Sequence, residues 1–87
     1  MINFKEMIER ESVENILLYL APLRSFPDID NMFVRYKFEI IEKGLLYPAY
    51  ANLLKGGMFI EDEKGHTRKG PNWKEPEFVT KKKYGIE

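Results

Sequence analysis

Apolar residues near the N-terminus recur three and four positions apart, which is the spacing of an amphipathic helix. Two such stretches occur, over residues 4–8 and residues 13–20, and a polar segment between them interrupts the pattern. Asn3 and Glu6 stand three positions apart, as an N-cap and its reciprocal partner do, and Ser12 can cap a second helix. The pattern therefore predicts either one bent helix or two short helices.

A second helical pattern covers residues 31–44, after a segment in which Pro22 and Pro27 disfavour a continuous helix. Its apolar positions again fall three and four apart. An aspartate before it, Asp28 or Asp30, is expected to cap this helix, because a short carboxylate side chain can accept a hydrogen bond from the first free backbone N–H groups. Gly44 is placed to end it.

A shorter helical pattern over residues 47–54 is followed by the signature of a β-hairpin. Pro48 suits the first turn of that helix, and a double glycine ends it. Met58–Ile60 are apolar and predict a short buried strand, while His66–Lys69 predict a polar return strand. Gly65 lies between the two strands and can adopt the positive φ that a tight turn requires.

The order of these elements predicts an α+β, mostly α fold, with a three-helix core and a C-terminal β-hairpin. A chain of 87 residues that is 44% hydrophobic and 32% charged is expected to form one small globular domain, residues 1–87. Residues 72–87 form a C-terminal tail that contains Trp73, Phe78 and Tyr84. These aromatic side chains can fold back onto the body of the domain, because they carry large apolar surfaces.

Charge and composition narrow the function classes. The chain has 14 basic and 14 acidic residues, so its formal net charge is 0, which argues against the strongly basic surface that nucleic-acid binding usually requires. It has no cysteine, which excludes disulfides and thiolate metal sites. No apolar run has the length of a membrane span, and the N-terminal segment lacks the order of a signal peptide. We therefore expect a cytoplasmic protein without membrane contact.

Catalytic and metal chemistry find no support in the sequence. His66 is the one histidine, and transition-metal sites need several nitrogen or sulfur ligands. The carboxylates of Glu61, Asp62 and Glu63 fall in a predicted turn, whereas acid–base catalysis needs a perturbed group in a cleft. The glycine-containing segments lack the spacing of a phosphate-binding loop. The sequence thus predicts a non-enzymatic protein with no catalytic residue, no metal, no cofactor and no small-molecule ligand.

The segment IIEKGLLYPAYANLLKGGMFIEDEKGHTRKG, residues 40–70, resembles a winged helix-turn-helix domain. In one register, Tyr47–Leu54 is the recognition helix and Met58–Gly70 is the wing. In the other, residues 31–46 form the recognition helix and residues 47–54 the first strand of the wing. We favour the first register, because Pro48 would fit a strand only at its edge.

This resemblance implies a small protein that binds double-stranded DNA, a transcriptional regulator acting as a dimer. In such a complex the basic arm of the hairpin would lie along the phosphate backbone, and the short helix would contact the bases. The first helix or the C-terminal tail would supply the contact between two copies. The candidate DNA-binding residues are Arg35, Tyr47, Asn52, Lys55, Lys64, His66, Arg68 and Lys69.

A different function class remains open at this point. The acidic run Glu61–Glu63 directly precedes the basic arm and can pair with it, which would reduce the attraction for phosphate. The balanced charge and an aromatic content of 14% also fit a protein-binding module, because interfaces favour aromatic anchors. Examples would be an immunity-type or antitoxin-type protein, or a phage-encoded inhibitor, with another protein as its partner.

Overall fold

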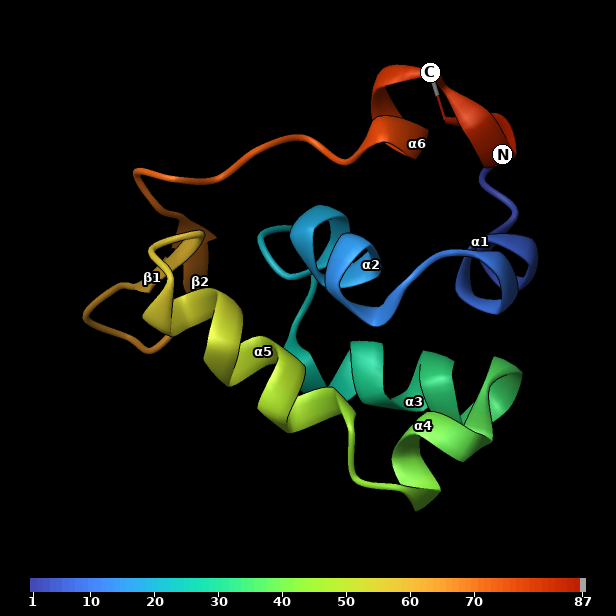
Figure 1. The fold of residues 1–87 in the computed structure, drawn as a ribbon, viewed down its shortest axis with the longest axis horizontal. Helices are drawn as coiled ribbons and strands as arrows, with labels where there is room; N and C mark the ends of the chain where they lie inside the picture. Colours follow the sequence, from blue (N-terminus) through green and yellow to red (C-terminus); the bar gives the residue numbers. More distant parts are fainter. Residues whose placement is uncertain (87) are drawn as a thin grey trace.

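The computed structural model describes residues 1–86 and is mostly helical, with one small antiparallel sheet (Figure 1). The helices are α1 (Phe4–Arg10), α2 (Val13–Leu20), α3 (Phe26–Tyr36), α4 (Phe38–Glu42), α5 (Leu46–Lys55) and α6 (Glu77–Thr80). The strands are β1 (Phe59–Glu61) and β2 (Thr67–Lys69), and a 3₁₀ turn, η1 (Lys83–Gly85), lies near the C-terminus. The expected class, mostly α with a hairpin, is confirmed, but five helices precede the hairpin where three were expected.

Two short helices, not one bent helix, occupy the N-terminal pattern. Asn3 Oδ1 accepts a hydrogen bond from Glu6 N at 3.0 Å, and Asn3 Nδ2 donates to Glu6 Oε2 at 3.3 Å. Ser12 is extended, and its Oγ accepts a hydrogen bond from Asn15 N at 3.1 Å. Each helix therefore begins at its own cap, as the sequence predicted.

The next helix differs from the prediction at both ends. Ser25 caps α3, because its Oγ accepts a hydrogen bond from Asp28 N at 3.3 Å; the prediction that Asp28 or Asp30 is the cap is wrong. Pro27 falls in the first turn, where the missing N–H has no helical partner to lose. At Lys37 the backbone leaves helical geometry, with φ −154°, and the predicted single helix is split into α3 and α4.

Glycines end both α4 and α5. Gly44 has a φ of +64°, and its N–H and that of Leu45 donate to carbonyls of the last turn of α4. Gly57, with a φ of +80°, ends α5 in the same way. Residues 47–54 therefore lie within a helix and not in a strand, so the second winged-helix register is wrong in this part.

The main core lies between the helices α2, α3 and α5 and the strand β1. Figure 1 shows α3 below α2, with α5 and the hairpin at one end of this pair. The buried side chains of this cluster include Ile16, Leu17, Leu20, Ile29, Phe33, Leu46, Tyr50 and Phe59. The hairpin joins this core through a single strand face, which fixes it against α5.

The C-terminal tail lies across α2 and against α1. Trp73 Nε1 donates a hydrogen bond to Leu18 O at 2.8 Å. Phe78 is buried together with Met7 and Ile86 in a second, smaller cluster. The apolar side of α1 and the tail thus pack against each other within one chain.

The segment before α1 and the turn η1 lie side by side (Figure 1). Asn3 N donates a hydrogen bond to Tyr84 O at 2.8 Å, and the Tyr84 hydroxyl donates to a carboxylate oxygen of Glu11. That hydrogen bond, followed by burial and the charge of Glu11, raises the pKa of Tyr84 to about 12. The neutral phenol is therefore the form that holds the tail.

We expect this contact to be lost at alkaline pH. The folded pKa of Tyr84 lies above its ordinary value of 10.0, so the stabilisation is complete below about pH 10 and disappears as the pH rises towards 12. The difference in free energy of unfolding between wild type and Tyr84→Phe should be about 1 kcal/mol at neutral pH and should shrink above pH 10. Urea denaturation across this range measures it. A difference that does not change with pH would contradict the contact.

Candidate functional site

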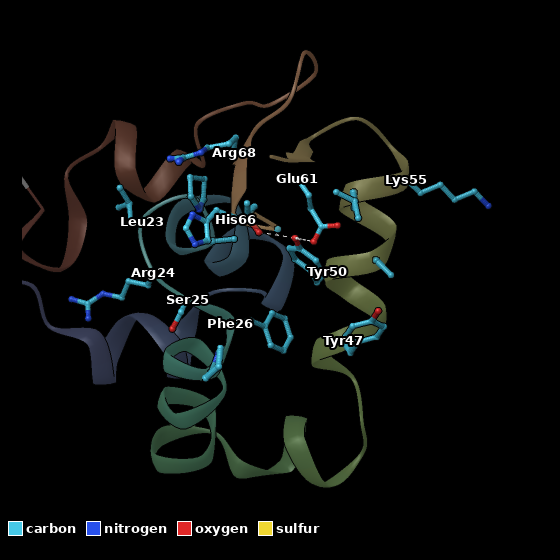
Figure 2. Close-up of a pocket in the computed structure, with 17 residues that line it drawn as sticks. Leu23, Arg24, Ser25, Phe26, Tyr47, Tyr50, Lys55, Glu61, His66 and Arg68 are labelled. Carbon is cyan, nitrogen blue, oxygen red and sulfur yellow. Dashed lines mark hydrogen bonds between the residues drawn. The ribbon is translucent and has the colours of Figure 1, made fainter. Parts of the chain in front are cut away.

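A groove of about 870 Å³ lies where three parts of the chain meet (Figure 2). One wall is formed by residues 21–27, which comprise the loop between α2 and α3 and the start of α3, and α5 forms another. The third side is the hairpin, through Glu61 and residues 65–68. The groove gathers side chains from three separate parts of the chain and is therefore the candidate site.

The helix α5 presents one stripe of side chains to the groove. Tyr47, Ala51 and Lys55 stand four positions apart, and Tyr50 and Leu54 fall between them. Because an α-helix has 3.6 residues per turn, side chains with this spacing share one face. Ala51 is the smallest of the five, so it leaves room between the larger side chains before and after it.

Aromatic rings build one side of the groove. Phe26, the first residue of α3, contacts Tyr47 edge-on with ring centroids 6.2 Å apart, and contacts Tyr50 at 5.5 Å. Tyr50 in turn stacks on the buried ring of Phe59, at 5.7 Å. Such pairs add about 0.5–1.5 kcal/mol each beyond the burial of their surface. These successive ring contacts connect the groove to the main core.

The hydroxyl of Tyr50 ties the helix to both strands. It donates a hydrogen bond to Glu61 Oε2 at 3.2 Å and shares another, at 2.6 Å, with Thr67 Oγ1 (Figure 2). Glu61 and Thr67 are also directly paired across the hairpin. Burial raises the pKa of Tyr50 above its ordinary value, with Glu61 acting in the same direction and the Thr67 hydrogen bond against it. The phenol therefore stays neutral and holds the hairpin in place.

The lining carries more positive than negative charge. Arg24, Lys55 and Arg68 contribute three cations, and Glu61 contributes one carboxylate. Figure 2 shows Arg24 and Lys55 on opposite sides of the groove, both extended away from its floor. The Arg24 guanidinium also lies 5.1 Å from the ring centroid of Phe4, which orients it without neutralising it.

Within the hairpin, Asp62 organises the turn and the basic strand together. Its Oδ1 accepts hydrogen bonds from Lys64 N and His66 N, both at 2.9 Å, and its Oδ2 accepts one from Arg68 Nε at 3.1 Å. The backbone N–H of His66 lowers the pKa of the Asp62 carboxyl most, and the Lys64 N–H and Arg68 lower it further. The acidic arm therefore pairs with part of the basic arm.

The turn is expected to loosen in acid. Because the pKa of Asp62 is lower when folded, its contribution to the stability of the turn is present above about pH 4 and is lost as the pH falls through the folded value. Amide hydrogen exchange followed by NMR should show Lys64 and His66 losing protection there. In Asp62→Asn, which keeps an acceptor oxygen but does not titrate in this range, their protection should not change with pH. An equal acid loss in both proteins would contradict this role.

Four of the eight candidate DNA-binding residues meet at the groove. They are Tyr47, Lys55, His66 and Arg68. Tyr47 and Lys55 come from α5, and the other two come from the far arm of the hairpin. The structure thus brings the predicted short helix and the predicted basic strand to one place.

The other four candidates lie elsewhere. Asn52 is exposed on α5 outside the lining of the groove, and Lys64 is exposed in the hairpin turn. Lys69 Nζ lies 4.1 Å from the ring centroid of Trp73, so this cation contacts the tail. Arg35 falls in the last turn of α3, at the end of that helix away from the hairpin (Figure 1). Arg35 does not belong to the lining of the groove.

Sequence reasoning missed the wall formed by the α2–α3 loop. Leu23, Arg24 and Phe26 lie in the segment APLRSFPD, which the sequence marked as a break between helices because of its prolines. The sequence did contain a signal for this wall: an apolar, a basic and an aromatic residue lie between two prolines. Connecting segments usually lie on the surface and often carry binding residues, so these side chains could have been considered as candidates.

No family model matches the sequence, and no curated protein or solved structure is detectably similar to it. Among residues 1–86, no helix has both the length and the apolar character needed to cross a membrane. The same residues contain no cluster of three or more histidine, cysteine, aspartate or glutamate side chains that could hold a metal ion. Any functional conclusion therefore depends on the geometry of the groove.

Proposed function

We propose that this is a small, non-enzymatic protein-binding module, of the kind that immunity-type, antitoxin-type or other inhibitor proteins represent, and that the groove is its binding surface. The observation that carries the proposal is the exposure of large apolar side chains along the walls. Tyr47 is 69% exposed and Leu23 is 66% exposed, on opposite walls of the groove. Aromatic and aliphatic side chains held in this way are typical anchors of protein interfaces.

The rigidity of the groove supports this proposal. Tyr47 contacts Phe26, which contacts Tyr50, and the Tyr50 hydroxyl is bonded to both strands of the hairpin. A surface that is already ordered loses little conformational entropy when a partner binds, so more of the contact energy appears as affinity.

The charge distribution also favours a protein partner over DNA. Arg68 is paired with Asp62, and Lys69 lies over Trp73, so two cations of the basic arm are engaged within the chain. The whole chain has a formal net charge of 0. Phosphate contacts supply most of the affinity of nonspecific DNA binding, and this surface has few cations to make them.

Selection from a displayed library of random peptides tests the proposal. The wild-type protein, immobilised, is expected to enrich a family of related peptides that bind it in solution with micromolar affinity or better, measured by fluorescence anisotropy. An unrelated immobilised protein of similar size serves as the control. Enrichment no greater than that of the control would overturn the proposal.

Binding of duplex DNA, as a dimeric transcriptional regulator of the winged-helix type, is the second candidate. The order α4, α5 and hairpin favours it, because it resembles a helix-turn-helix followed by a wing. Under this candidate the exposed residues Asn52 and Lys55 of α5 would face the bases, and the basic strand would contact the backbone.

A salt titration with a generic DNA duplex separates the two candidates. DNA binding predicts an affinity that falls steeply as salt rises, and a higher affinity for Asp62→Asn, because this variant releases Arg68 for phosphate. The protein-binding proposal predicts no measurable DNA binding by either protein, even at low salt. Tight binding by both would contradict the proposal.

A further inference from the structure

We propose that the groove takes a partner segment in which one bulky apolar side chain is flanked on both sides by carboxylates. This inference rests on the proposed function and adds the chemistry of the partner. It follows from the placement of charges and apolar side chains around the groove, which are complementary to such a segment.

Two cations of the lining, one of them held over the Phe4 ring, lie on opposite sides of the groove. Arg24 is on the loop wall and Lys55 is on α5, and Figure 2 shows the two side chains directed away from each other. Among residues 1–86, neither of them forms an ion pair with a carboxylate. A segment that crosses the groove would therefore meet a positive charge near each end, which attracts Asp or Glu and disfavours Lys or Arg at these two places.

Within residues 1–86, the one carboxylate of the lining, that of Glu61, already has a hydrogen-bond partner within the chain. Glu61 accepts a hydrogen bond from the Tyr50 hydroxyl, so its carboxylate is used in holding the hairpin to α5. Asp62 is paired with Arg68 and does not belong to the lining of the groove. The cations of Arg24 and Lys55 therefore determine which charges a bound segment can carry.

Apolar side chains make up much of the lining apart from the two cations. Tyr47 and Leu54 stand four positions before and three positions after Ala51 on α5. Phe26 lines the same groove, so the small methyl group of Ala51 leaves space that a larger side chain of a partner can fill. Burying one aromatic or leucine side chain there would remove apolar surface from water on both molecules, at about 25 cal/mol per Å². The centre of the groove thus selects a bulky apolar anchor.

The openness of the walls favours a peptide segment over a small molecule. Sites for small ligands bury about 70–90% of the ligand surface. Here Tyr47 and Leu23 on the two walls remain largely exposed, so a small compound would stay in contact with solvent. A segment of a larger partner can continue beyond the groove and cover these side chains.

The peptides enriched by the wild-type protein provide the first test. We expect a Trp, Phe or Leu with an Asp or Glu on each side of it. Enriched peptides that carry Lys or Arg in these flanking places, or no charge, would overturn the inference. They would leave the proposed function intact, because peptides would still bind.

Neutral variants of the two cations provide the second test. In Arg24→Gln with Lys55→Gln, affinity for the best acidic peptide should fall about tenfold at low salt and less at high salt. The control, Lys5→Gln with Lys43→Gln, removes the same charge from exposed positions outside the groove and should change affinity less than about twofold. Thermal melts confirm that both proteins fold.

The possible results distinguish a failure of the partner chemistry inferred here from a failure of the proposed protein-binding function. Equal affinity of the groove variant and wild type overturns the inference alone, and so does an equal loss in groove variant and control, since that would reflect the overall charge. Displacement of the peptide by a DNA duplex, lost in the groove variant, would show that the groove recognises phosphate, and would overturn both the inference and the proposed function.

Discussion

Replacing Phe59 by alanine is expected to lower the free energy of unfolding by about 3–5 kcal/mol. The Phe59 side chain is 1% exposed and stacks on the ring of Tyr50, within the main core. Truncation would remove that contact and leave a cavity between the hairpin and α5. A domain of this size is stabilised by about 5–10 kcal/mol in total, so the variant should lie close to its unfolding transition at room temperature.

Ile60 offers a matched control in the same strand. Its side chain is 49% exposed on the opposite face of β1, and Ile60→Ala should change the free energy of unfolding by less than about 0.5 kcal/mol. Urea denaturation followed by circular dichroism measures both variants. Similar values for the two would mean that the hairpin is not anchored to the core, and the third side of the groove would then have no fixed position.

Much of the secondary structure is encoded locally and was therefore predictable. Asn3 and Ser12 start their helices through hydrogen bonds to groups three residues away. Gly44 ends α4 because the chain needs a positive φ at that position. In each case the cause and the effect lie within a few residues, where patterns of residue type are informative.

The break at Lys37 has a different origin. Residues 31–44 have a continuous helical pattern, yet Lys37 leaves the helix, and its Nζ donates a hydrogen bond to Glu11 O at 3.5 Å. This partner belongs to the N-terminal part of the chain, just after α1, and periodicity contains no information about it. The break therefore coincides with contacts between α1 and α3 that the local pattern does not encode.

The groove was predictable only in part. The α5 and hairpin sides were recognised, because Tyr47, Lys55 and Arg68 fall in elements that the pattern located correctly. The loop wall with Arg24 was missed, because a break between helices gives no indication of what it faces. The pairing of Arg68 with Asp62 follows from the register of the hairpin, which the turn residues alone do not determine.

Filling the groove should abolish most of the affinity for a partner. Ala51→Trp places a rigid, uncharged side chain between Tyr47 and Lys55, where the apolar anchor of a bound segment would lie. We expect the selected peptide to bind about thirtyfold more weakly, a loss of about 2 kcal/mol in binding free energy, because bulk added to an occupied space costs about 1–3 kcal/mol.

Asn52→Trp is the control for this variant. It adds the same side chain one position further along α5, on an exposed surface outside the lining of the groove. Its affinity for the peptide should stay within about twofold of wild type, because residues next to each other on a helix point in directions about 100° apart. Equal affinity for Ala51→Trp and wild type would mean that the peptide binds at another surface.

The most direct test of the groove is a map of amide chemical shifts during titration of the labelled protein with the selected peptide. The account predicts that the largest changes occur at Arg24, Phe26, Ala51, Leu54 and Thr67, which come from the three sides of the groove. Changes concentrated at Arg35 and the helix α4, or on α1 and the C-terminal tail, with these five amides unaffected, would contradict it.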